Sequence, residues 1–460
     1  MEAIVILIFI LGYLTITVEH PLKLDKTVPA LIMAAIMWGL LAVGFHQGWF
    51  NVINTEGSIF SYFSGGETAV VGFEETMLHH FGKTAEILIF LIGAMTIVEI
   101  IDLHKGFDVI KTLVKTTNKR KLLWIIGLIG FFLSAVIDNL TATIVLITVL
   151  RKLIHKPKDR IWFASLIIIA ANAGGAWSPI GDVTTTMLWI ADKVTTMGLV
   201  TNIVLPAIFC FVVPYTIASF MPAFKGNIDV DLKNNSNEQR LLSSRTILFM
   251  GIGGILSVPF TKTLLHLPPY MGMMLALGLV WLVSEYIHPE EDFSEEKRHM
   301  FSAPKALSRI EFSSILFFLG ILMAVAALES MVYGTINGET VGTLRYLAEV
   351  LQNTLPNQDI VVIMLGFVSA VVDNVPLVAA SMGMYDMSVY PVDSFLWHFI
   401  AYCAGTGGSM LIIGSAAGVA AMGMEKIDFI WYLKKISWLA MSGFLAGAAV
   451  FLFIEHVVRA

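Results

Sequence analysis

The sequence predicts an all-α integral membrane protein, an inverted-topology repeat of about ten transmembrane helices, two re-entrant hairpins and two broken helices. Three observations predict this fold. Hydrophobic residues make up 57% of the chain and charged residues only 14%, against about 25% charged in soluble domains. Uncharged runs recur along the chain, several of them near the length of about 20 residues that spans a bilayer. Two motifs inside these runs occur twice.

Ten of the apolar runs predict spanning helices. The first follows Glu2 without a basic segment or a cleavage site, so we expect a retained helix and not a signal peptide. Cys210 and Cys403 lie inside two of the runs, where we expect packing and no disulfide or metal role. The ten runs cover residues 3–18, 28–45, 84–98, 161–181, 194–224, 246–261, 263–284, 312–328, 394–424 and 436–454.

Two further runs, 122–150 and 360–385, predict re-entrant hairpins. Each is interrupted near its middle, and a limb of about 12 residues reaches only about halfway across the bilayer. Basic residues at both ends of the first predict a hairpin that enters from the cytoplasm, whereas aspartates flank the second and predict entry from outside. With this topology all but five of the 29 Lys and Arg residues are cytoplasmic, and both termini lie outside.

The interruptions belong to a duplicated motif. Ser134–Asn139 reads SAVIDN and Ser369–Asn374 reads SAVVDN, with five of six residues identical 235 positions apart. Some 35 residues beyond each copy, a glycine-rich break interrupts another run, at Asn172–Asp182 and at Gly405–Ser415. Because the two hairpins enter from opposite faces, the duplication predicts an inverted repeat.

This repeat divides the chain into four parts. Backbone that is broken at membrane depth must be buried in protein or line a wet cavity. We therefore expect the four breaks to converge near the midplane, as in secondary transporters. The parts are a first helix and inner loop (1–27), a first repeat (28–220, hairpin 122–150, broken helix 161–190), a cytoplasmic linker and connecting helix (221–268), and a second repeat (269–460, hairpin 360–385, broken helix 394–424).

Three aspartates stand at the breaks: Asp138 and Asp373 at the hairpin tips, and Asp182 in the first broken helix. Ionisable residues at bilayer depth are costly and are usually functional. Hard oxygen donors surround Asp138 and Asp182, and such donors favour Na⁺, Li⁺ or a proton over a soft metal. Helix capping is the alternative; it explains neutral residues but not a carboxylate at this depth. The neutral candidates are Asn139, Thr141, Asn172, Thr184 and Thr185.

The two repeats differ chemically. At an offset of 233, Asp182 corresponds to Ser415, and Thr184 corresponds to Ala417. The first repeat therefore carries two of the three carboxylates, and we expect it to form the main cation site with Asp138 and Asp182 as metal ligands. Asp373, Asn374 and Ser409 are expected to complete this site from the second repeat.

The central negative charge also bears on the substrate. Bare aspartates would repel a di- or tricarboxylate, so a cation is the expected cargo. Two buried carboxylates that lie close together repel each other, and one of them would then hold a proton or a metal ion. Competition between the two ions for this pair produces antiport. We expect no cofactor besides the transported Na⁺ or Li⁺ and H⁺.

Four other titratable residues are candidates for a proton path or for pH sensing: Glu86, Glu329, His79 and His80. Both glutamates lie near the outer ends of predicted helices, and both histidines lie in an acidic segment that we expect to be an outer loop. The alternative is that the glutamates reach the membrane interface and that the histidines are solvated.

These motifs resemble the NhaD-type sodium/proton antiporters, whose superfamily includes arsenite permeases and divalent-anion/sodium symporters. The resemblance implies a scaffold, a transport domain with two hairpins and two broken helices, elevator-like motion and often a homodimer. It also implies a bacterial inner (plasma) membrane protein with lipid, but not nucleic acid, as a partner. The site residues it implies are Asp138, Asn139, Asn172, Asp182, Thr184, Thr185, Ser369, Asp373, Asn374 and Ser409, with Ser415 as well placed as Ser409.

Three alternatives remain open. A transporter of arsenite or a dicarboxylate on the same fold is the nearest, although the Asp-Asn hairpin tips depart from the Ser-Asn-Thr signature of the anion carriers. An intramembrane aspartyl protease also needs two membrane aspartates, but here they lie in different sequence contexts. A passive channel would not need a group that traps protons.

Overall fold

The computed structural model describes residues 2–17, 22, 24–113, 116–228, 243–286, 302–336, 338–355 and 357–459. Helices dominate these ranges, and the strands in them form two short antiparallel hairpins, so the predicted all-α membrane fold is confirmed. The chain forms two compact units.

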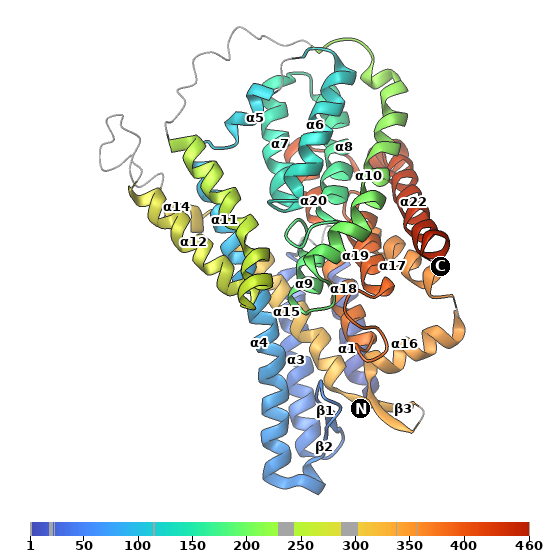
Figure 1. Cartoon of the computed structure of the whole chain (residues 1–460). Coiled ribbons are helices and arrows are strands. Elements are labelled where there is room, and N and C mark those ends of the chain that lie inside the picture. Colours follow the sequence, from blue (N-terminus) through green and yellow to red (C-terminus); the bar gives the residue numbers. More distant parts are fainter. Residues whose placement is uncertain are drawn as a thin grey trace. The chain divides into compact units, whose positions relative to one another are not determined.

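The first unit comprises residues 1–88, 311–362 and 375–392. Some of its helices lie wholly within the unit, and one of these follows the second β-hairpin (Figure 1). Its elements are α1 (Glu2–Thr17), α3 (Thr27–His46), β1 (Val52–Ile53), β2 (Ile59–Phe60), α15 (Phe312–Ser330), β3 (Val332–Ile336), β4 (Glu339–Gly342), α16 (Thr343–Thr354), and parts of α4 (Tyr62–Leu103), α17 (Gln358–Val371) and α18 (Asn374–Met384).

Helices α3 and α15 pack closely along their length. The Trp38 indole Nε1 donates to the Met323 carbonyl at 2.8 Å, and the Thr27 hydroxyl donates to the Ser313 carbonyl at 2.9 Å. Gly320 lies against the backbone of Ala30, where a Cβ would collide. These contacts satisfy polar groups inside an apolar interface, as burial requires.

Helix α4 extends over 42 residues with a kink at Gly66, where φ is +53°, and it is much longer than the predicted span at 84–98. Its additional N-terminal part is amphipathic: Ala69, Phe73, Thr76 and His80 are buried at helical spacing. The Phe73 ring contacts both Trp38 and Phe45 of α3. The expectation of an outer loop around His79 and His80 is therefore wrong, because glutamates on the other face hid the apolar stripe from a search for uncharged runs.

The second unit comprises residues 89–310, 363–374 and 393–460. Most of the described helices lie in this unit, and many of them lie wholly within it. They are α5 (Asp108–Leu113), α6 (Lys119–Ser134), α7 (Asn139–Leu153), α8 (Pro157–Gly175), α9 (Val183–Ile190), α10 (Thr196–Phe220), the 3₁₀ turn Pro222–Phe224, α11 (Ser243–Leu265), α12 (Pro269–Tyr286), α14 (Ala303–Leu307), α19 (Phe395–Gly407), α20 (Ala416–Glu425), α21 (Phe429–Lys435), α22 (Ser437–Phe453) and the π turn Ile454–Val458.

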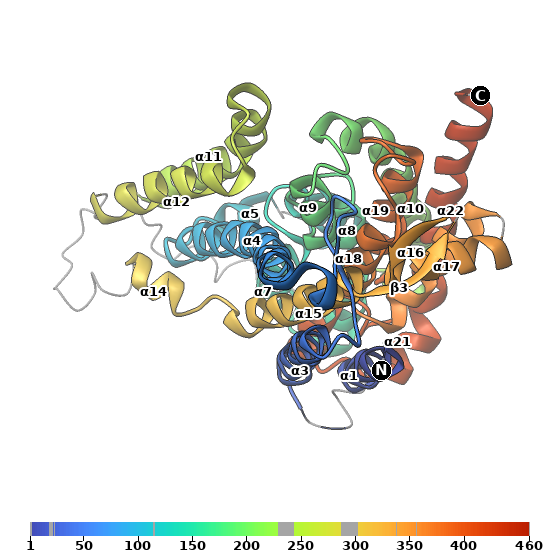
Figure 2. The ribbon, with the colours of Figure 1, turned by 90° about the horizontal axis from the view of Figure 1, so that it is seen from below.

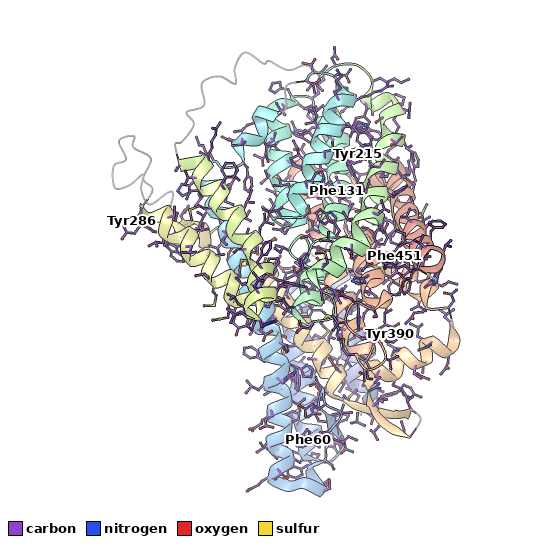
Figure 3. The ribbon with its side chains drawn as sticks, in the orientation of Figure 1. Phe60, Phe131, Tyr215, Tyr286, Tyr390 and Phe451 are labelled. Carbon is purple, nitrogen blue, oxygen red and sulfur yellow. The ribbon has the colours of Figure 1, made fainter. Side chains whose placement is uncertain are left out.

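Aromatic packing joins α6, α8 and α10 in this unit. Phe131 of α6 and Tyr215 of α10, both labelled in Figure 3, each contact the ring of Phe211, which also lies on α10. The Tyr215 hydroxyl donates to the Leu166 carbonyl of α8 at 3.0 Å. A buried phenol needs such a partner. Cys210 and Cys403 are free thiols, and both are buried.

Six described helices are long and apolar enough to cross a bilayer, and α16 with α17 would add a seventh if they form one span. They are α3, α4, α10, α11, α15 and α22 with its π turn. The other predicted spans coincide with shorter helices or helix pairs: α1, α8 with α9, α12, and α19 with α20. Helix α12 packs beside α11 (Figure 2). The protein is a multi-pass membrane protein.

Close backbone packing in the second unit generates a stability prediction. A Cβ at Gly174 of α8 would overlap the Phe131 carbonyl of α6, so Gly174→Ala should force the two helices apart. Overpacking costs about 1–3 kcal/mol, so we expect a lower thermal unfolding midpoint in detergent. Gly39→Ala in α3, where a Cβ has no neighbour within 4 Å, is the control; equal midpoints for both variants would contradict the prediction.

Candidate functional site

All four predicted breaks are present, and all lie in the second unit. Residues 135–138 separate α6 from α7, residues 176–182 separate α8 from α9, residues 372–373 separate α17 from α18, and residues 408–415 separate α19 from α20. Each break leaves helix ends with backbone groups that no helix satisfies. Within apolar surroundings, side chains near these ends must supply the missing partners.

The breaks of the two repeats share their local bonds. The Ser134 hydroxyl donates to the Ala171 carbonyl at 2.6 Å, and the Ser369 hydroxyl donates to the Ala404 carbonyl at 2.9 Å. Each serine opens its copy of the six-residue motif. Ser369, a predicted site residue, therefore ties α17 to α19 through backbone, and Ser134 does the same between α6 and α8.

Asp182 and Ser415 occupy the same position in the two repeats. Each is the residue before a half-helix, and their backbones have nearly equal conformations, with φ −149° and ψ 144° at Asp182 and φ −145° and ψ 153° at Ser415. The correspondence predicted from the offset is therefore present in the structure. The same backbone holds a carboxylate before α9 and a hydroxyl before α20.

The Asp182 carboxylate accepts hydrogen bonds from three side chains. The Thr184 hydroxyl donates to Oδ2 at 2.6 Å, Asn374 Nδ2 donates to the same oxygen at 3.2 Å, and Asn139 Nδ2 donates to Oδ1 at 3.3 Å. The first backbone N–H groups of α9 also face this carboxylate. Residues from both hairpin tips thus meet at one acid.

Asn172 extends this network into the second repeat. Its Oδ1 accepts from Asn139 Nδ2 at 3.0 Å, and its Nδ2 donates to the hydroxyls of Ser409 at 2.9 Å and Ser415 at 3.0 Å. The sequence left Ser409 and Ser415 as equal candidates, and the structure places both on the same amide. In the sequence, Ser415 was indicated by the repeat offset of 233, which pairs it with Asp182.

Asp182 is only 2% exposed, and Asn139, Asn172, Asn374 and Ser409 are buried around it. Among the described residues, no Lys, Arg or His forms an ion pair with Asp182; the charged group that interacts with it is the carboxylate of Asp373. A buried charge without a counter-charge is costly. Binding a proton or a metal cation removes that cost.

Asp138 has a different environment. Its Oδ1 accepts from the Thr141 backbone N–H at 2.8 Å and its Oδ2 accepts from the Thr141 hydroxyl at 2.7 Å, so Asp138 caps α7. Its φ of +88° is unusual for a residue other than glycine. This conformation turns the chain sharply and places the next residue, Asn139, at the start of α7 beside Asp182.

Thr185 also bonds to backbone. Its hydroxyl donates to the carbonyls of Ser178 at 2.7 Å and Asp182 at 2.9 Å, which closes the loop before α9. Gly405 of α19 provides room for the acid, because a Cβ there would lie 3.2 Å from Asp182 Oδ2. The described side chains form no cluster of three or more His, Cys, Asp or Glu able to hold a metal ion, so a cation here would need amide, hydroxyl or carbonyl oxygens as well.

The four candidates for a proton path lie in the first unit. Glu86 pairs with Lys83 at 3.7 Å, and Glu329, the residue before the last of α15, has its carboxylate beside Gly383. His80 is buried against Trp38, whereas His79 is exposed. None of these residues belongs to the Asp182 network.

Comparison with known proteins extends these observations. Residues 5–401 match the CitMHS family, described as citrate transporters. Sodium/proton antiporter 2 of Arabidopsis thaliana is 39% identical, with 98% of this chain and 99% of the relative covered. Sodium/proton antiporter 1 of the same plant is 40% identical over 98% of this chain and 72% of the relative.

A further relative is less similar but covers the same share of this chain. The Na⁺/H⁺ antiporter NhaD of Alkalimonas amylolytica is 29% identical, with 98% of this chain and 90% of the relative covered. The family match covers most of the chain, including three of the four breaks in the helices. This protein therefore belongs to the CitMHS citrate transporter family.

Proposed function

We propose that this protein is a secondary transporter that exchanges Na⁺ or Li⁺ for H⁺, and that both ions compete for Asp182. The observation that carries the proposal is a buried carboxylate surrounded by neutral amides and hydroxyls, without a described cationic partner. Such an acid is stable only when it is neutralised. A proton and a small hard cation can each do so, and only one of them at a time.

The neighbouring amides suit this exchange. As placed, Asn139 and Asn374 turn their NH₂ groups toward the carboxylate. Rotating either amide by half a turn would present an oxygen ligand instead, because the two ends of an amide are nearly equal in shape. We therefore propose Asn139, Asn172, Asn374, Thr184 and Ser409 as the neutral part of the site, with Asp138 and Asp373 as the other acids. Thr141, Thr185 and Ser369 support them through the α7 cap and through backbone carbonyls.

The names of the relatives support a cation over citrate as the substrate. Two Arabidopsis relatives are named sodium/proton antiporters, and the relative from Alkalimonas amylolytica is named a Na⁺/H⁺ antiporter. Citrate transport would bring a multiply charged anion to Asp182 and Asp373. Like charges at a binding site cost several kcal/mol. Transport of arsenite or a dicarboxylate is the alternative that the experiments below distinguish.

The proposed domain organisation is the one that the sequence repeat predicts. The second unit, which contains all four breaks, would be the transport domain, and the first unit would be the scaffold of a homodimer. The two halves would be inverted repeats, at 28–220 and 269–460, joined by the linker and connecting helix at 221–268. The distribution of Lys and Arg supports a topology with both termini outside. A bacterial plasma membrane location and a role in pH homeostasis are further parts of the proposal.

Replacing Asp182 by Asn should abolish Na⁺-dependent proton release while leaving the fold intact, because the amide keeps the shape but cannot exchange a proton for a cation. Fluorescence dequenching in everted vesicles across pH, at matched protein abundance, measures this. Gly39→Ala is the matched control and should exchange normally. Exchange by Asp182→Asn at the wild-type rate would refute the assignment.

Asp138 distinguishes helix capping from cation binding. An asparagine at this position can still cap α7, so capping alone predicts that Asp138→Asn retains exchange and Asp138→Ala loses it. We expect both variants to lose Na⁺-dependent proton release, because the site needs the second negative charge. Normal activity of Asp138→Asn would remove Asp138 from the cation site and leave it as a cap.

The choice of substrate is tested with purified protein in proteoliposomes that contain a pH indicator. Adding Na⁺ or Li⁺ outside should change the internal pH, whereas arsenite, succinate and citrate should not. Uptake of radiolabelled citrate or succinate driven by a Na⁺ gradient, with no pH response to Na⁺ alone, would favour the alternative.

A further inference from the structure

Helix α20 connects the Asp182 network to a cluster of charges around the buried carboxylate of Glu425. Ser415 precedes its first turn and accepts from Asn172 Nδ2 at 3.0 Å and from the Gly418 backbone N–H at 3.2 Å. Glu425 is its last residue. The helix has 10 residues, which is about 15 Å in length. A short helix is stiff, so a displacement at Glu425 would be transmitted to Ser415.

The Glu425 side chain is fully buried between two arginines. Its Oε1 accepts from Arg151 Nε at 2.7 Å and its Oε2 accepts from Arg160 Nε at 2.5 Å. The Arg151 guanidinium also donates to the Met424 carbonyl, and Arg160 Nη1 donates to the Ile154 carbonyl at 3.1 Å. Removing one member of a buried charge cluster leaves another charge uncompensated, so this cluster holds the end of α20 firmly.

The same three helices meet at both clusters. Helix α7 carries Asn139 at one end and Arg151 in its last turn, and α8 carries Arg160 in its first turn and Asn172 near its end. Helix α20 packs on both. The three helices are therefore linked at the Asp182 network by hydrogen bonds between neutral side chains, and at their opposite ends by the ion pairs of Glu425. The way the three helices pack sets the separation of Asn172 and Ser415.

The other half-helix has a comparable attachment. Lys262 of α11 donates to the Trp189 carbonyl near the end of α9 and pairs with Asp192 at 2.8 Å. Helix α9 begins directly after Asp182. A cation near a helix C-terminus is favourable because it meets unsatisfied carbonyls and the negative end of the helix dipole. Both half-helices are thus held from the end opposite the site by a cationic side chain.

We propose that Glu425, Arg151 and Arg160 are positioning residues that set the affinity for the cation by fixing Ser415 against Asn172. The proposal depends on the proposed function, because it assigns the effect to the Asp182 network. Both arginines belong to the basic residues that the topology assigns to the cytoplasmic side, and both pair with one fully buried carboxylate.

The test measures the apparent KM for Na⁺ and the maximal exchange rate in proteoliposomes. Loss of a group that orients a ligand typically lowers metal affinity by about 10-fold or more, so Glu425→Gln and Arg160→Gln should each raise the KM by about that factor, with the maximal rate near wild type. Arg160→Lys keeps the charge and should recover part of the affinity. Lys158→Gln changes an exposed basic residue in the same first turn of α8 and is the control.

A coupling measurement excludes general destabilisation. In a Ser415→Ala background, Glu425→Gln should add little to the KM, because residues that act through one contact have non-additive effects. Additive effects, or wild-type KM values for both Glu425→Gln and Arg160→Gln, would overturn the proposal. Should Glu425→Gln fail to fold, Glu425→Asp and Arg160→Lys are measured in the same cycle and must meet the same criterion.

The same experiment separates the two hypotheses. If wild-type protein exchanges Na⁺ for H⁺, Asp182→Asn does not, and the Glu425 variants are normal, only the positioning role fails. If Asp182→Asn still exchanges the ions at the wild-type rate, the Asp182 site is misassigned and the positioning role fails with it, while the exchange activity stands. If the wild-type protein does not exchange Na⁺ for H⁺, the proposed function itself fails.

Discussion

The burial of a carboxylate at a break in a helix is the constraint on which the second unit depends. Asp182 lies where α8 has ended and α9 has not begun, and its neighbours must satisfy both the free backbone and the acid. Amides from α7 and α18 bond to the acid, and the α8 amide bonds to the one from α7. The hydroxyls of Ser134 and Thr185 bond to backbone carbonyls. Because each amide also belongs to a helix end, the geometry of the site and the arrangement of the half-helices are not separable.

The sequence predicted the positions of the four breaks because they interrupt apolar runs with Gly, Asn, Asp and Ser, and the repeated motif gave each break a counterpart. It also predicted the equivalence of Asp182 and Ser415, since the offset is arithmetic. It could not predict that Asn172 would bond to both Ser409 and Ser415. A contact between residues more than 200 positions apart depends on how helices pack, and nothing local encodes it.

Two further differences have physical causes. The length of α4 was missed because an amphipathic stripe, with Phe73 and His80 on its buried side, does not form an uncharged run. Arg151 and Arg160 were counted among the cytoplasmic basic residues, and the complete burial of Glu425 between them depends on the approach of α7, α8 and α20. Charge placement along the sequence predicts the side of the membrane, but it does not predict which charges are paired.

The matching backbone at Asp182 and Ser415 has an evolutionary consequence. Two copies of an ancestral segment could diverge here by one side chain, since the surrounding main chain accepts either residue without refolding. A single codon substitution can change the number of acids that a descendant carries through its transport cycle. That number decides whether exchange moves net charge and responds to voltage. Electrogenic and electroneutral lineages can thus arise from one scaffold without new helices.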